Sequence, residues 1–262
     1  MGGRVSGALT VEGVTKVFAR TRRTGEVVAL DGIDLHVDPG ELVCIVGASG
    51  CGKSTLLNIA GGLDSATAGA VRVDGERVVG PGPDRGMVFQ AYSLYPWKSV
   101  ADNIAFGLRI ARWAAPRRDE RVRELLGIMG LTEWAGHRPG QLSGGMRQRV
   151  AIARALAPEP DVLLLDEPFG ALDAQTKRAM QDFLLQVQSR TATTILMVTH
   201  DVAEAVYLSQ RVYVFSARPG RVADEVIIPF GPQRGTTVQR DPRFLDLRDE
   251  IEDLLHPTRA PV

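Results

Sequence analysis

The chain has 262 residues and carries 31 Lys and Arg against 31 Asp and Glu, so its formal net charge is zero. A balanced chain has no overall field that would recruit nucleic acid or an anionic membrane surface, which argues against a sequence-independent DNA-binding protein. Hydrophobic residues at 44% and charged residues at 24% exclude a disordered, collagen-like or disulfide-scaffold protein and indicate a globular domain.

No apolar stretch approaches the roughly 20 residues that a membrane-spanning helix requires. The longest stretches are Leu42–Val46, Val162–Leu165 and Ile195–Val198. The amino-terminal residues also lack the apolar segment of about 7 to 15 residues that marks a secretory signal. We therefore expect a chain that neither spans a membrane nor carries a leader.

The amino-terminal part of the chain predicts an antiparallel β-unit. Leu9–Phe18 has the composition of a strand, and between residues 33 and 37 apolar and polar side chains alternate. Strict alternation is typical of a strand with one buried and one exposed face, as in an antiparallel sheet.

A second kind of strand follows. Every residue of Leu42–Val46 is apolar, as in a strand that is buried on both faces of a parallel sheet. The same signature recurs at Val162–Leu165 and Thr194–Thr199. The clearest helical patterns between these strands are Lys53–Leu63, Gly144–Ala157 and Ala174–Ser189. Strands that alternate with helices predict an α/β fold with a mostly parallel sheet.

The middle of the chain loses the strand signal, and Ser99–Ile110 and Asp119–Met129 predict helices. Near the end, Asp241 followed by Pro242 predicts a helix start. One face of that helix is apolar: Phe244, Leu247, Ile251, Leu254 and Leu255. We expect residues 1–90 and 158–228 to form an α/β core with its β-unit, residues 91–157 a helical insertion, and residues 229–262 a short extension with an amphipathic helix.

A glycine-rich loop follows the first buried strand and opens a helix. It reads Gly-Ala-Ser-Gly-Cys-Gly-Lys-Ser-Thr over residues 47–55, the phosphate-binding P-loop pattern in the context that the pattern demands. The dinucleotide-binding pattern fails here because its third glycine is absent. In such a loop, Lys53 reaches the β- and γ-phosphates and Ser54 ligates Mg²⁺. We expect ATP to be bound by Gly47, Ser49, Gly50, Cys51, Gly52, Lys53, Ser54 and Thr55.

Two acidic residues end the next buried strand, at Asp166 and Glu167. A P-loop fold brings this strand beside the first one, so the paired carboxylates would need a cation there. We expect Asp166 to belong to the Mg²⁺ shell, and Glu167 to act as the catalytic base toward the attacking water.

A second phosphate-binding surface is predicted at residues 142–149, which read Leu-Ser-Gly-Gly-Met-Arg-Gln-Arg. Ser143, Gly144 and Gly145 leave a helix N-terminus open to an anion. If this surface and the P-loop are exposed on separate subdomains, the segment cannot reach its own P-loop. We therefore expect it to serve the ATP of a second subunit.

These elements occur in the order found in the ATP-binding subunits of ATP-binding cassette (ABC) transporters, which the chain resembles over roughly residues 8–228. The resemblance implies a P-loop NTPase core with an N-terminal antiparallel β-subdomain and a helical insertion. It also implies that Gln90 touches Mg²⁺ and the attacking water and that His200 contacts the γ-phosphate, both as catalytic residues. Phe18 would stack on adenine, and Asp173 in the D-loop (Gly170–Asp173) would join the nucleotide-binding residues.

Finer similarity points to the nitrate, sulfonate and taurine importer group. It is carried by Tyr95–Ile104, Glu204–Leu208 and Phe215–Arg221. The implied function is an ATPase subunit that energises import of a small anionic or polar solute, driven by ATP-dependent closure of a dimer. A lipid or lipoprotein exporter and a non-transport ABC ATPase stay open as alternatives.

The resemblance also implies the partners and the location of the chain. The expected partners are a second copy or a homologous ATPase subunit, transmembrane permease subunits and, indirectly, an extracytoplasmic solute-binding protein, with no nucleic acid. The chain would sit at the cytoplasmic face of the cell membrane. The solute itself does not touch this chain, so the sequence does not identify it.

Overall fold

The computed structural model describes residues 7–19, 25–231, 234–235 and 237–256. The first six residues, on which the expectation of no leader largely depends, lie outside these ranges. Within them, no helix combines the length and the hydropathy needed to cross a membrane.

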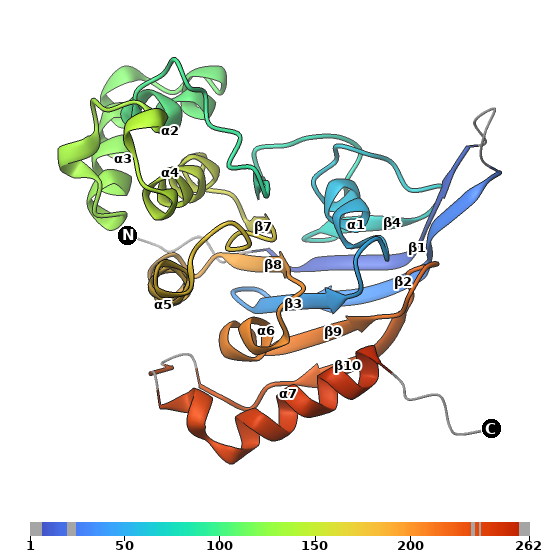
Figure 1. Ribbon diagram of the computed structural model, residues 1–262. Coiled ribbons are helices and arrows are strands. Elements are labelled where there is room, and N and C mark those ends of the chain that lie inside the picture. The colour runs from blue at the N-terminus through green and yellow to red at the C-terminus, as the bar shows by residue number, and fades with distance from the viewer. Residues whose placement is uncertain (1–6, 20–24, 232–233, 236, 257–262) are drawn as a thin grey trace, which may run out of the picture.

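The amino-terminal β-unit is a four-stranded antiparallel sheet in the order β2-β1-β4-β5 (Figure 1). Along β2 the apolar side chains Ile33, Leu35 and Val37 are buried, as the alternating pattern predicted. The strands are β1 (Leu9–Phe18), β2 (Val27–Val37), β4 (Ala68–Val73) and β5 (Glu76–Arg77).

A six-stranded sheet forms the centre of the molecule in the order β10-β9-β3-β8-β7-β6. All neighbours pair in parallel except β10, which is antiparallel to β9. The expected α/β core with a mostly parallel sheet is therefore confirmed. The strands are β3 (Leu42–Gly47), β6 (Arg85–Val88), β7 (Val162–Asp166), β8 (Thr194–Val198), β9 (Arg211–Phe215) and β10 (Val222–Ile227).

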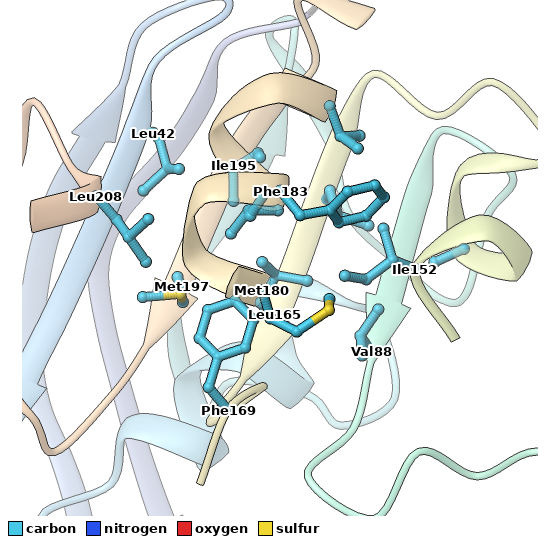
Figure 2. Close-up of a cluster of buried hydrophobic side chains, with 14 of the residues drawn as sticks. Leu42, Val88, Ile152, Leu165, Phe169, Met180, Phe183, Ile195, Met197 and Leu208 are labelled. Atoms are coloured by element: carbon cyan, nitrogen blue, oxygen red, sulfur yellow. The ribbon is translucent and has the colours of Figure 1, made fainter. Parts of the chain in front are cut away.

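Both faces of this sheet are covered, which explains its continuous apolar runs. In β3, Val43 and Ile45 pack into one cluster with the β1–β2 strands and helix α1 (Lys53–Ala60). The alternate residues Leu42 and Cys44 pack into a second cluster with the remaining helices. Figure 2 shows part of the second cluster, where Met180 and Phe183 of α5 (Ala174–Thr191) lie against residues of β7 and β8.

The helical insertion gathers at one end of the molecule (Figure 1). It contains α2 (Val100–Ile110), α3 (Ala115–Ile128), two short 3₁₀ turns (Thr132–Trp134 and Pro139–Gln141) and α4 (Gly144–Leu156). Helix α3 begins four residues before the expected Asp119. Its first turn contains Pro116, which helices accept there because the missing N–H has no intrahelical partner.

The carboxyl-terminal helix α7 (Pro242–Leu255) starts as predicted, with the Asp241 carboxylate accepting a hydrogen bond from the N–H of Arg243. Its apolar face packs onto the second cluster, with Phe244 and Ile251 fully covered. It lies against β9, β10 and α6 (Val202–Leu208), and a 3₁₀ turn (Val238–Arg240) precedes it. The extension is thus part of the hydrophobic core.

A buried arginine joins this extension to α6. The Arg234 guanidinium donates to the carbonyl oxygens of Val206, Tyr207 and Ser209 at 2.7–2.9 Å, and also to those of Phe230 and Gly231. Burial lowers the pKa of Arg234 to about 10. The side chain thus satisfies the carbonyl groups that the end of a helix leaves without intrahelical partners.

We expect Phe244→Ala to lower the free energy of unfolding by about 3–5 kcal/mol, because it removes a ring that is only 2% exposed from the core. The matched control is Leu245→Ala on the same helix, where the side chain is 39% exposed and the loss should stay below about 1 kcal/mol. Urea denaturation of both variants measures the difference. A loss below about 1 kcal/mol in both variants would mean that α7 contributes little through packing.

Candidate functional site

The glycine-rich loop connects β3 to α1 and depends on glycine at two positions. Gly50 and Gly52 have φ values of +77° and +107°, which side-chain-bearing residues rarely adopt. A Cβ atom on Gly52 would also lie 2.7 Å from Leu30 Cδ2 and 2.8 Å from the Ala29 carbonyl oxygen. Strand β2 of the antiparallel sheet therefore packs directly against this loop.

Lys53 begins α1 and folds back into the loop. Its ammonium donates to the carbonyl oxygens of Gly47 at 2.6 Å and Ala48 at 3.1 Å, and the side chain is nearly buried. The positive charge is thus held on the inner side of the loop, where backbone N–H groups of a P-loop face a bound phosphate.

The structure brings Ser54 and Asp166 together, as the sequence predicted for two Mg²⁺ ligands. The Ser54 hydroxyl donates to the Asp166 carboxylate at 3.0 Å. Burial raises the pKa of Asp166, the Ser54 hydrogen bond opposes this rise, and the neighbouring Glu167 carboxylate adds to it. A carboxylate held in this way favours a nearby cation.

Three predicted catalytic residues meet at the same edge, although they follow three different strands. Glu167 Oε2 lies 3.0 Å from His200 Nδ1 and 3.5 Å from Gln90 Nε2. Gln90 follows β6, Glu167 follows β7 and His200 follows β8, and these strands are neighbours in the sheet. A carboxylate, an imidazole and an amide around one point can orient and deprotonate a water molecule.

The residues at the end of β7 also fit a magnesium ion by their chemistry. The Ser54 hydroxyl, the Asp166 carboxylate and the Gln90 side-chain amide offer oxygen atoms, which Mg²⁺ prefers. Ser54 and Asp166 are already hydrogen-bonded to each other, and the Gln90 amide approaches Glu167, the residue after Asp166.

The predicted second phosphate-binding segment lies elsewhere. Ser143 caps α4, and its hydroxyl accepts a hydrogen bond from the N–H of Met146 at 3.3 Å. In Figure 1, α4 lies well apart from α1 and the glycine-rich loop. A cavity of about 330 Å³ opens beside Ser143 and Gly145 and borders the first turn of α5. The structure therefore does not bring Ser143, Gly144 and Gly145 to the chain's own P-loop.

Two further predicted residues lie at the ends of other elements, Asp173 at the start of α5 and Phe18 at the end of β1. Asp173 caps α5 by accepting a hydrogen bond from the N–H of Thr176 at 3.0 Å, and hydrogen bonding to Thr176 lowers the pKa of Asp173. Phe18 ends β1 with its ring 43% exposed and the Lys16 ammonium 5.0 Å from the ring centroid. An exposed ring of this kind can stack on an adenine base.

The sequence analysis missed a support behind the P-loop. The Arg218 guanidinium donates to the Gly50 carbonyl at 3.0 and 3.2 Å. A Cβ atom on Gly220 would lie 2.1 Å from the Cys51 carbonyl oxygen. These contacts span about 170 residues of sequence, so only the tertiary structure reveals them.

A P-loop beside a strand-end carboxylate pair, on a mostly parallel sheet, defines a nucleotide-hydrolysing ATPase. Residues 30–170, more than half of the chain, match the ABC transporter family. The chain belongs to this family, and it is an ATP-binding subunit with ATPase activity.

Similar proteins extend the match along the chain. The nitrate import ATP-binding protein NrtD of Synechocystis sp. is 49% identical over 253 residues, which cover 94% of each chain. The taurine import ATP-binding protein TauB of Rhizobium johnstonii is 46% identical, covering 92% of this chain and 94% of TauB. A solved dimer of the ATP-binding cassette MJ0796, bound to ADP and Pi, matches with a TM-score of 0.73 and 33% identity, covering 85% of this chain and all of that one.

Proposed function

We propose that this chain is the ATPase subunit of an importer for a small anionic or polar solute of the nitrate, sulfonate or taurine type. The names of the similar import subunits support this assignment and do not favour the exporter or the non-transport alternative. The observation that carries the enzymatic part is the meeting of Gln90, Glu167 and His200 beside the P-loop.

Each side chain has a role in this proposal. Lys53 binds the β- and γ-phosphates, and Phe18 stacks on the adenine. Mg²⁺, when bound by Ser54, Asp166 and Gln90, would neutralise charge on the phosphates. Glu167 accepts a proton from the attacking water.

His200 binds the γ-phosphate and holds the Glu167 carboxylate in its orientation. The hydrogen bond of 3.0 Å between the two side chains supports this second part of the role.

The active site would be shared between two subunits. Ser143, Gly144 and Gly145, at the start of α4 and apart from the chain's own P-loop (Figure 1), would complete the site of the partner subunit together with Asp173. The dimeric cassette with ADP and Pi supports such an assembly. ATP would close the dimer and hydrolysis would reopen it, with the helical insertion (91–157) moving against the α/β core.

The surface that passes this motion to a permease would lie after Gln90. Trp97 is 68% exposed, and its ring lies 5.7 Å from that of Tyr95. Arg154 of α4 donates to the carbonyls of Tyr92 and Ser93, so the segment is attached to the helix that Ser143 caps. The subunit would thereby dock on transmembrane subunits at the cytoplasmic face, while a solute-binding protein supplies the solute on the opposite side.

We expect Glu167→Gln to lower the rate of ATP hydrolysis by ~10²- to 10⁴-fold while Mg·ATP still binds, because the amide keeps the size of the side chain and cannot accept the proton. Steady-state hydrolysis and nucleotide titration in the reconstituted transporter measure both quantities. Hydrolysis at the parental rate would show that another group is the base.

A charged residue at position 97 should separate docking from nucleotide binding. We expect Trp97→Glu to abolish co-purification of the permease while the ATP affinity of the isolated chain changes by less than about threefold, or ~0.7 kcal/mol. Val79→Glu, at an exposed apolar residue after β5, should change neither. Loss of both properties in Trp97→Glu would place this segment within the nucleotide site, and co-purification of ribosomes or DNA with the parental chain would overturn the transport function.

A mixed dimer tests the shared site. We expect covalently paired Lys53→Ala and Ser143→Arg chains to hydrolyse ATP, although each homodimer is near background. In the mixed dimer both defects fall on one composite site, so the other site keeps an intact P-loop opposite an intact Ser143. Hydrolysis by a Ser143→Arg homodimer at the parental rate would contradict the sharing.

A further inference from the structure

The residues on both sides of His200 are fixed by hydrogen bonds that the proposed reaction does not use. The Thr199 hydroxyl donates to the Glu204 carboxylate at 2.5 Å and accepts from the N–H of Asp201 at 3.1 Å. The Asp201 carboxylate accepts from the N–H of Glu204 at 3.0 Å and so caps α6. The imidazole of His200 itself is largely exposed.

Glu204 is the centre of this arrangement. It is only 3% exposed and accepts hydrogen bonds from Thr199 at 2.5 Å and from the Gln181 amide at 2.9 Å. The Lys177 ammonium lies 3.2 Å from Glu204 Oε1, the oxygen that also accepts from Gln181. A buried carboxylate is tolerated only when it is paired and hydrogen-bonded, so this geometry is strongly specified.

Lys177 connects this centre to the D-loop. It lies in the first turn of α5, and its backbone N–H donates to the Asp173 carbonyl at 2.8 Å. Its ammonium donates to Asp201 at 2.8 Å. The same turn packs on α4, since a Cβ atom on Gly145 would lie 2.8 Å from Thr176 Cγ2. One helical turn therefore touches the Ser143 helix, the D-loop and the segment that carries His200.

We propose that Lys177 and Glu204 are positioning residues for His200. Through them, the D-loop and Ser143, which serve the nucleotide of the partner subunit, are coupled to the contact between His200 and the γ-phosphate in the chain's own site. The inference rests on the proposed role of His200. A displacement of α5 caused by the partner subunit's nucleotide moves the Lys177 ammonium, and with it the backbone on either side of the imidazole.

The Lys177 ammonium and the Asp201 carboxylate are both charged throughout the neutral pH range, as the directions of their pKa shifts show. Burial lowers the pKa of Lys177, but the hydrogen bond and charge of Asp201, together with the charge of Glu204, outweigh burial and raise it above its ordinary value. Burial raises the pKa of Asp201, but the hydrogen bond and charge of Lys177 together with the hydrogen bond from the Glu204 N–H outweigh burial, and the pKa lies below its ordinary value. A cavity of about 610 Å³ borders Lys177 and Asp201 on the side of residues 239–240.

Lys177→Met removes the link, and Lys177→Arg retains a cation that can reach Asp201. In the full-length chain, assembled so that it hydrolyses ATP, we expect Lys177→Met to lower kcat by ~10- to 100-fold with the KM for ATP within about threefold, because small displacements of a catalytic group have large effects on rate. Lys177→Arg should restore at least a third of the parental kcat. Arg190→Met, an exposed position on the same helix, should be unchanged.

Two further measurements separate positioning from a merely structural role. In a His200→Ala background, Lys177→Met should lower kcat by less than about threefold more, because residues that act through one group are not additive. The NMR signal of the His200 imidazole should shift in Lys177→Met and stay in place in Arg190→Met. Glu204→Gln keeps the size of the side chain but removes its charge and leaves one acceptor oxygen for Thr199 and Gln181. It serves if Lys177→Met does not fold, and should lower kcat with the melting temperature within a few degrees.

The inference would be overturned if the losses of kcat in Lys177→Met and His200→Ala multiplied in the double variant. It would also be overturned if Lys177→Met showed an unshifted imidazole signal and the parental kcat. If His200→Ala alone hydrolyses ATP at the parental rate, the proposed role of His200 fails instead. In that case a shifted imidazole signal in Lys177→Met would still show the structural link.

Discussion

Parallel pairing of β6, β7, β8 and β3 is the constraint on which the site depends. Parallel neighbours end at the same edge of a sheet, so the residue that follows each apolar run emerges beside the others. The register pairs Val88 with Leu165 and Asp166 with Val198. Gln90, Glu167 and His200 therefore meet although 110 residues of sequence separate the first from the last.

Glu167 illustrates what the sheet imposes on the backbone. Its φ of +44° lies in the left-handed region, which costs a non-glycine residue about 1 kcal/mol or more. The position is held because its N–H donates to the Val198 carbonyl at 2.9 Å, one step beyond the paired strands. The carboxylate is thereby turned toward His200 and Gln90. Strain at this residue is offset by the regular hydrogen bonding of the strands behind it.

The sequence predicted those parts of the fold whose signals are local. The P-loop, the buried strands and the start of α7 each depend on a few consecutive residues, and the structure forms them where expected. Strands β4, β5, β6, β9 and β10 were not predicted. Of these, β5 has two residues and β6 has four, one of them a glycine, which is too few for a periodic pattern. The contact of Arg218 with Gly50 and the pairing of Lys177 with Glu204 depend on tertiary structure alone.

The cap that Arg234 places on α6 also sets an order of events during synthesis. Helix α6 has seven residues, too few to be stable alone in water. Its last carbonyl groups receive their donors from a residue 26 positions beyond its end. During synthesis, His200 and all residues of α6 are therefore translated before the arginine that caps this helix. The helix that follows His200 therefore reaches its final form only after Arg234 has been synthesised, later than the P-loop and strands β3, β7 and β8.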